Sequence, residues 1–211
     1  MRGHRAAGDA AGPAGAGKME SQLRGINMSI RNAQDGMGLI QTAESGLNEI
    51  RNMVLRIREL AVQMANGIYE NTPDRSNAQL EVTALIDQVT LIAENTRFND
   101  IAVLDGSFTG VSIQTGNTTA ETITLSFIDV ASSGLSIDTA TVATQSDATV
   151  AMGTMDTALQ TIASEQAKFG SLINRLNFSV ANQSKASVMT EQAIGRVLDA
   201  DFATETTNLS K

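Results

Sequence analysis

Residues 23–64, LRGINMSIRNAQDGMGLIQTAESGLNEIRNMVLRIRELAVQM, decide the fold, because their apolar side chains recur at alternating steps of three and four residues. This stripe consists of Leu23, Ile26, Ile30, Ala33, Met37, Ile40, Ala43, Leu47, Ile50, Val54, Ile57, Ala61 and Met64. A mean step of about 3.5 residues keeps a narrow apolar seam on one side of a helix over many turns. One helix cannot bury such a seam in water by itself, so the stripe predicts a long helix that has a partner.

A second stripe of the same kind lies near the other end of the chain. It consists of Met152, Met155, Leu159, Ile162, Gln166, Phe169, Ile173, Leu176, Val180, Gln183, Ser187, Thr190, Ile194 and Val197. Two complementary stripes predict two long helices that pack together, neither of them stable without the other. We therefore expect a mainly α-helical protein with a small β flank: an elongated, antiparallel, coiled-coil-like rod of N- and C-terminal helices plus a β-hairpin.

Three polar residues interrupt the second stripe, namely Gln183, Ser187 and Thr190. Buried polar groups can fix the register between two helices. Alternatively, the helix pair tapers at this point and these side chains lie in water. The sequence leaves both interpretations open.

The chain divides into four segments. Residues 1–18 are mainly Ala, Gly and charged residues, which is typical of a flexible leader, and we expect part of it to have been added by cloning. Residues 19–100 hold two helices, residues 101–146 hold a β-hairpin and a short irregular region, and residues 147–211 hold the long C-terminal helix. All but the leader belong to one rod domain.

Turn signals and periodicity set the elements inside these segments. The first helix should end at Asn66-Gly67, because Gly adopts the left-handed conformation that ends helices. A second helix should start after Thr72-Pro73. Its apolar face would be Ala78, Val82, Leu85, Val89 and Ile92. Residues 111–115 and 121–127 alternate with a period of two around a Gly-Asn turn, which predicts the hairpin.

The composition argues against several classes of partner. A net charge of −8 opposes nucleic-acid binding, which depends on Lys and Arg at phosphates. The chain has no cysteine, so it forms neither disulfides nor thiolate metal sites. No stretch reaches the roughly 20 apolar residues of a transmembrane helix. No apolar segment follows Met1–Arg5, so we expect neither membrane insertion nor a cleaved signal peptide.

Candidate catalytic, cofactor and metal sites are weak. Residues 12–19, GPAGAGKM, approach a phosphate-binding loop, but Met19 replaces the hydroxyl residue that holds Mg²⁺, and no strand precedes the glycines. We interpret this segment as a linker. His4 is the one histidine and lies in the leader. Asp199 and Asp201 are typical of a solvated helix face, with a weak cation site as the alternative. We therefore expect no enzyme, no cofactor and no metal.

The segment 55–63, LRIRELAVQ, differs from the rest of the first helix. Arg56, Glu59, Leu60 and Gln63 lie off the main seam and mix charge with an apolar side chain, which suits recognition of a protein partner. Leu60 alternatively lies beneath the second helix as ordinary core, and periodicity alone favours that interpretation.

Blocks of sequence at both ends of the chain resemble bacterial flagellin, the subunit of the flagellar filament. On the N-terminal side these blocks are Ser29–Gly36 (SIRNAQDG), Gln41–Ile50 (QTAESGLNEI), Arg56–Gln63 (RIRELAVQ), Thr96–Asn99, Val103-Leu104, Ile113–Gly116 and Glu121–Ile123. On the C-terminal side they are Asp199–Glu205 (DADFATE) and Asn208–Lys211. The resemblance extends over nearly the whole chain from Met19 to Lys211.

This resemblance implies a structural protein that polymerises with copies of itself, by rod-to-rod packing, into the extracellular filament that drives motility. It implies export through the secretion channel of the flagellum, with an export chaperone and without a cleaved signal peptide. It also implies a contact surface of Arg56, Glu59, Leu60, Gln63 and Glu81. This surface would meet neighbouring subunits along a protofilament and be bound by the flagellin-sensing Toll-like receptor of animals.

Two alternatives to flagellin differ in kind. One is a hook-filament junction protein, which shares terminal resemblance with flagellin. The other is a surface adhesin or polysaccharide-binding protein on a flagellin scaffold, for which the Thr-rich residues 109–149 would be the binding patch. A glycan-binding assay on that patch separates the second alternative from a filament subunit.

The sequence lacks segments resembling the innermost filament tube of flagellins and has at most a very small outer domain. We therefore expect a core fragment that does not polymerise, and predict a monomer in sedimentation experiments. Filaments that form spontaneously in electron micrographs would contradict this prediction.

Overall fold

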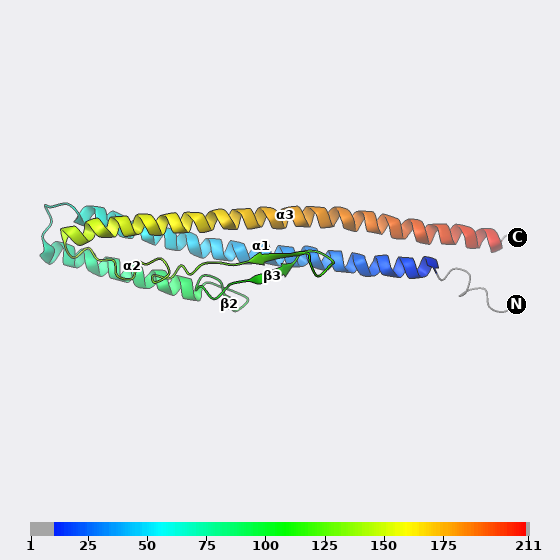
Figure 1. The fold of residues 1–211 in the computed structure, drawn as a ribbon, viewed down its shortest axis with the longest axis horizontal. Coiled ribbons are helices and arrows are strands. Elements are labelled where there is room, and N and C mark those ends of the chain that lie inside the picture. Colours follow the sequence, from blue (N-terminus) through cyan, green and yellow to red (C-terminus); the bar gives the residue numbers. More distant parts are fainter. Residues whose placement is uncertain (1–10, 210–211) are drawn as a thin grey trace. The chain divides into compact units, whose positions relative to one another are not determined.

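The computed structural model describes the backbone of residues 11–209 and the side chains of residues 15–196. Its helices are α1 (Ala11–Met64), α2 (Ser76–Asn95) and α3 (Gln145–Leu209), and a π-type turn, η1 (Asn71–Arg75), precedes α2 (Figure 1). Its strands are β1 (Arg97–Phe98), β2 (Ile101–Ala102), β3 (Val111–Gln114) and β4 (Thr122–Leu125). The expected fold class, mainly helical with a small β flank, is confirmed.

The chain forms two compact units. The described part of the first unit comprises residues 11–36, 113–123 and 175–209, and the second unit comprises residues 37–112 and 124–174. Each unit contains a part of α1, a part of α3 and the residues that pack on them.

Helix α1 begins earlier than the sequence analysis expects. Residues 11–18, assigned above to a flexible leader, are helical, and residues 1–10 of that leader lie outside the described residues. Extending an existing long helix costs much less free energy than nucleating a new one. Pro13 is tolerated because it is the third residue of the helix, where a backbone N–H has no intrahelical acceptor.

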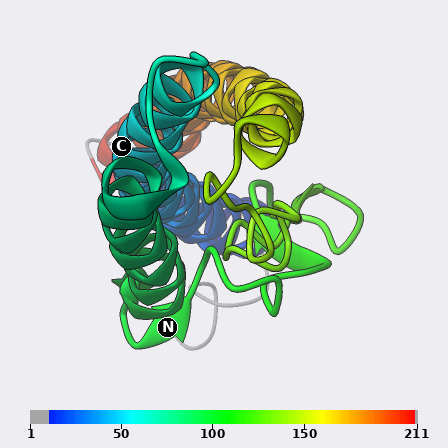
Figure 2. The same cartoon turned by 90° about the vertical axis from the view of Figure 1, so that its left-hand side faces the viewer.

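In the second unit, the stripe of α1, one face each of α2 and α3, and apolar residues between Val103 and Val142 form the core. Every member of the first stripe from Ile40 to Met64 is buried, which confirms the seam in this unit. Helix α3 contributes Ala148, Ala151, Met155, Ala158, Ile162 and Phe169 to the core, whereas the expected stripe members Met152, Leu159 and Gln166 are only half-buried. Viewed end on, the C-terminal half of α1, α2 and the start of α3 lie side by side (Figure 2).

Two polar contacts fix how α1 and α3 pair within the second unit. Arg58 Nε donates to Asp156 Oδ1 at 2.6 Å, and Gln166 Nε2 donates to Asn48 Oδ1 at 2.7 Å. From the first contact to the second, the residue number falls by ten on α1 and rises by ten on α3. The pairing is therefore antiparallel, with a constant register over this stretch.

The buried face of α2 is rotated from the expected one. Val82 and Val89 are buried as expected, but Ile86 and Ala93 complete the buried face, whereas Ala78, Leu85 and Ile92 are half-buried at its side. Both sets recur at helical spacing, so the sequence alone could not tell which of the two faces the core.

In the first unit, two of the three polar residues of the second stripe connect α3 to other elements. Ser187 is buried and its Oγ donates to Asn27 Oδ1 at 3.2 Å, while Gln183 Nε2 donates to Thr115 O at 3.1 Å. These contacts favour the register interpretation for Ser187 and Gln183. Thr190 instead donates to the carbonyl of Ala186 in its own helix, at 2.8 Å.

The strands form two small pairs. The hairpin β3–β4 is confirmed, although it is shorter than the alternating pattern suggests. The pair β1–β2 was not expected, because the β segment predicted from the sequence begins at Ile101 and β1 lies before it. The two residues that connect these strands, Asn99 and Asp100, have φ angles of 49° and 64°. Left-handed residues at both central positions are typical of a two-residue hairpin turn, and Asn and Asp tolerate that conformation.

Helix α3 begins with a reciprocal cap. The backbone N–H of Asp147 donates to Thr144 Oγ1 at 3.1 Å, and Thr144 Oγ1 donates to Asp147 Oδ2 at 2.7 Å. A Thr side chain capping the N–H group three residues on is one half of a capping box, and the contact back from Asp147 goes to the Thr hydroxyl. The helix therefore starts at Gln145, two residues before the expected Asp147.

We predict that two phenylalanines of α3 differ strongly in their contribution to stability. Phe169 is fully buried and meets Phe127 edge to face, with 4.7 Å between ring centroids, whereas Phe178 is 77% exposed. Phe169→Ala should lower the free energy of unfolding by about 3–5 kcal/mol, because it leaves a cavity. Phe178→Ala, the matched control, should change it by less than about 0.5 kcal/mol. Urea unfolding followed by circular dichroism measures both, and equal effects would contradict the packing described here.

Candidate protein-interaction surface

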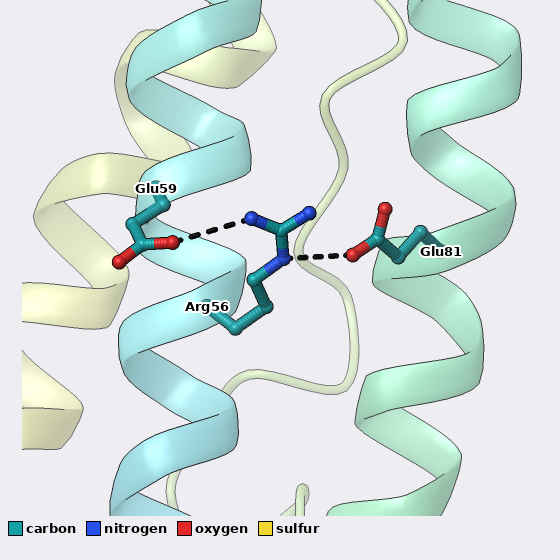
Figure 3. A network of polar contacts seen from close by, with 3 residues as sticks. All are labelled: Arg56, Glu59 and Glu81. Carbon is teal, nitrogen blue, oxygen red and sulfur yellow. Dashed lines mark hydrogen bonds and ion pairs between the residues drawn. The ribbon is translucent and has the colours of Figure 1, made fainter.

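An exposed charge cluster connects α1 to α2 in the second unit (Figure 3). Arg56 Nε donates to Glu81 Oε1 at 2.8 Å, and Arg56 Nη1 donates to Glu59 Oε2 at 3.3 Å. The exposed fractions of these three side chains lie between 45% and 68%. The cluster is therefore ordered by its own hydrogen bonds and remains accessible to a partner.

Local geometry explains how these residues meet. Arg56 and Glu59 are three residues apart on α1 and share one side of that helix. The loop after α1 returns the chain as α2, which places Glu81 within reach of the same guanidinium. Spacing within α1 could reveal the first pair, but the second depends on how α2 packs. Only the family resemblance predicts that Glu81 belongs to this surface.

The charges in the cluster reinforce one another. The hydrogen bond to Glu81 and then the one to Glu59, with electrostatic attraction to both carboxylates, raise the pKa of Arg56. The positive charge of Arg56 is therefore stabilised by both carboxylates. A partner would meet one fixed cation between two carboxylates, a pattern that a flexible lone arginine does not present.

Gln63 extends the exposed surface by one turn of α1. Its Nε2 donates to the hydroxyl of Tyr69 at 3.3 Å, which ties α1 to the loop before α2. Ile68, next to Tyr69, is strongly exposed. The surface therefore has a charged centre and an apolar side chain at its edge.

Leu60 does not share this exposure. Only 4% of Leu60 is accessible, so it belongs to the core, as the alternative interpretation expected. It follows Ile57 by three residues and precedes Met64 by four, and both of these are buried members of the seam. Leu60 can therefore support the surface from below but cannot contact a partner directly in this conformation.

The described residues form no candidate metal site. Among them, no group of three or more His, Cys, Asp or Glu side chains could hold a metal ion. None of the helices, over the part of the chain described, is both long and apolar enough to cross a membrane. The side chains of Asp199 and Asp201 lie outside the described residues.

One open hollow of about 270 Å³ lies in the first unit, between α1 and the turn that joins β3 to β4. Two of its polar side chains are engaged within the protein. Asn32 Nδ2 donates to Gln114 O at 3.2 Å, and Ser29 Oγ donates to Ile26 O at 2.8 Å.

Comparison with known proteins identifies the family. Residues 2–109 match the bacterial flagellin N-terminal helical region, and residues 152–211 match the bacterial flagellin C-terminal helical region. The chain is 36% identical to a flagellar filament core protein of 31.3 kDa from Treponema maltophilum, over 100% of the chain and 79% of that protein. It is 33% identical to a flagellin from Halalkalibacterium halodurans, over 97% of the chain and 76% of that protein.

Solved structures agree in fold. The crystal structure of Bacillus cereus flagellin matches with a TM-score of 0.66 at 35% identity, covering 72% of this chain and 88% of that one. A protein from Vibrio parahaemolyticus described as flagellar hook-associated matches with a TM-score of 0.73, covering 90% of this chain and 99% of that one, but at 12% identity this likeness shows the fold alone. With both terminal regions matched in sequence, this chain belongs to the bacterial flagellin family, whose members are structural subunits of the flagellar filament and not enzymes.

Proposed function

We propose that this chain is a filament subunit that packs side by side with its copies through the outer faces of its long helices. Family membership implies self-association, and the distribution of apolar side chains supports this way of packing. The stripe of α1 is buried from Ile40 to Met64, yet large apolar side chains stay exposed on the helices: Leu80 on α2, and Val150, Phe178 and Met189 on α3. Exposed apolar side chains are what a subunit interface buries.

We propose further that the Arg56 surface is a specific protein contact within this assembly. The surface comprises Arg56, Glu59, Gln63 and Glu81, with Leu60 beneath it. The observation that carries the proposal is the exposed guanidinium held between Glu81 and Glu59 at 2.8 and 3.3 Å. A pre-ordered charged group loses little side-chain entropy on binding, which favours recognition.

The same surface is proposed to serve two protein partners. In the filament it meets a neighbouring subunit along a protofilament. In an animal host it is bound by the flagellin-sensing Toll-like receptor, as the family resemblance at Arg56, Leu60 and Glu81 implies. One surface cannot serve both at once, so the receptor would recognise the unassembled subunit.

Export is proposed to follow the family as well, through the secretion channel of the flagellum and with an export chaperone. Loss of the protein from the culture medium when that channel is deleted would support this route. The absence of spontaneous filaments from this chain stays a prediction.

We predict that reversing the charge at Arg56 breaks partner binding without unfolding the protein. Arg56→Glu places three carboxylates together on a surface whose centre is one cation, so binding to the receptor ectodomain should fall by roughly tenfold or more. Surface plasmon resonance measures the binding, and circular dichroism should find an unchanged helix content. Arg51→Glu, at another exposed arginine of α1, is the matched control.

A charge swap sharpens this experiment. The double variant Arg56→Glu with Glu81→Arg restores an ion pair between α1 and α2 but inverts the charges that a partner meets. Binding should stay weak if the partner reads the charges directly. Full recovery of binding in the swap, or unchanged binding in Arg56→Glu, would overturn the proposed role of this surface and leave family membership untouched.

A further inference from the structure

Arg75 is a buried cation held almost entirely by backbone oxygens. It ends the π-type turn before α2 and is only 3% exposed. Its Nε donates to Met64 O at 2.9 Å, and its Nη2 donates to Asn66 O at 2.8 Å. Its Nη1 donates to Tyr69 O and to Asn71 Oδ1. No ion pair among the described residues includes Arg75.

The position of these oxygens explains why an arginine is needed. Met64 is the last residue of α1, and the last carbonyls of a helix have no intrahelical donor and carry the negative end of the helix dipole. Asn66 and Tyr69 are loop residues whose carbonyls face the same point. A planar guanidinium presents five donors in a fixed fork, which can satisfy such a set of acceptors, whereas an ammonium group is a single point of charge.

The loop that Arg75 holds reaches the interaction surface through one residue. Tyr69 gives its carbonyl to Arg75 and accepts a hydrogen bond on its hydroxyl from Gln63, a member of the Arg56 surface. The exposed Ile68 precedes Tyr69 directly. The placement of Tyr69 and Ile68 beside Gln63 therefore depends on the buried guanidinium.

We propose that Arg75 is a positioning residue: it fixes the loop of residues 65–74, and through Tyr69 it makes this loop a preformed apolar edge of the Arg56 surface. The inference rests on the proposed function, which supplies the partner: a protein that contacts a charged centre flanked by Ile68 and Tyr69. Its structural half, the fixing of Tyr69 by Arg75, can be tested without any partner.

The single tyrosine makes the test specific. The chain has one tyrosine and no tryptophan, so near-ultraviolet emission reports on Tyr69 alone. In Arg75→Lys, acrylamide should quench this emission severalfold more efficiently at temperatures far below the melting transition. A residue that contributes only to global stability would lower the melting temperature and leave quenching of the native state unchanged. Arg51→Lys, at an exposed site of α1, is the matched control and should change neither.

Partner binding tests the other half. Arg75→Lys should weaken binding to the receptor ectodomain by several-fold. Tyr69→Phe keeps the ring and the backbone carbonyl but removes the hydroxyl that Gln63 meets, so it should weaken binding even if Arg75→Lys fails to fold.

The outcomes separate the two proposals. If Arg56→Glu abolishes binding while Arg75→Lys changes neither Tyr69 quenching nor binding, Arg75 is not a positioning residue. If Arg75→Lys loosens Tyr69 but Arg56→Glu leaves binding intact, the proposed surface is wrong and the role of Arg75 in fixing the loop is supported.

Discussion

Burial of two long apolar stripes against each other is the constraint on which the rest of the structure depends. Helices of 54 and 65 residues gain most of their stability from packing of an amphipathic face, and little from intrinsic propensity. In the second unit, the members of the α1 stripe from Ile40 to Met64 are almost completely inaccessible to solvent. The antiparallel register at Asn48 and Arg58 then determines which exposed residues of α1 and α3 become neighbours.

The sequence predicts well those elements whose pattern repeats over many residues. The seam repeats over many turns, so single misplaced residues do not hide it, and the hairpin β3–β4 shows its alternation. Elements set by one or two residues were missed. The pair β1–β2 depends on left-handed Asn99 and Asp100, and the start of α3 depends on the cap at Thr144. The buried face of α2 could not be chosen because two sets of apolar residues recur at the same spacing.

The candidate surface is predictable only in part, for the same reason. Arg56 and Glu59 are neighbours by helical spacing, whereas Glu81 reaches Arg56 because of the way α2 returns along α1. The burial of Leu60 does not follow from the family resemblance. The resemblance groups Leu60 with exposed residues, whereas its position beside the seam buries it. Arg75 carries no sequence signal, since three of its four acceptors are backbone carbonyls.

One residue beside the stripe of α3 is a carboxylate that is buried, although buried positions of the helix are otherwise mostly apolar. Glu165 of α3 is 1% exposed and accepts a hydrogen bond from Lys168 at 2.8 Å, while its Oε1 has no partner among the described residues. Burying a carboxylate this way usually costs stability, whereas burying a well-packed apolar side chain does not.

Glu165 lies beside Gln166, whose contact with Asn48 fixes the register, so a polar patch interrupts an otherwise apolar stretch of α3. A stripe of uniform apolar side chains could slide by one repeat with little change in buried area, whereas a slide here would break the Gln166–Asn48 contact. Polar residues in the seam thus select one alignment of α1 and α3, and the residues that face outward depend on that alignment.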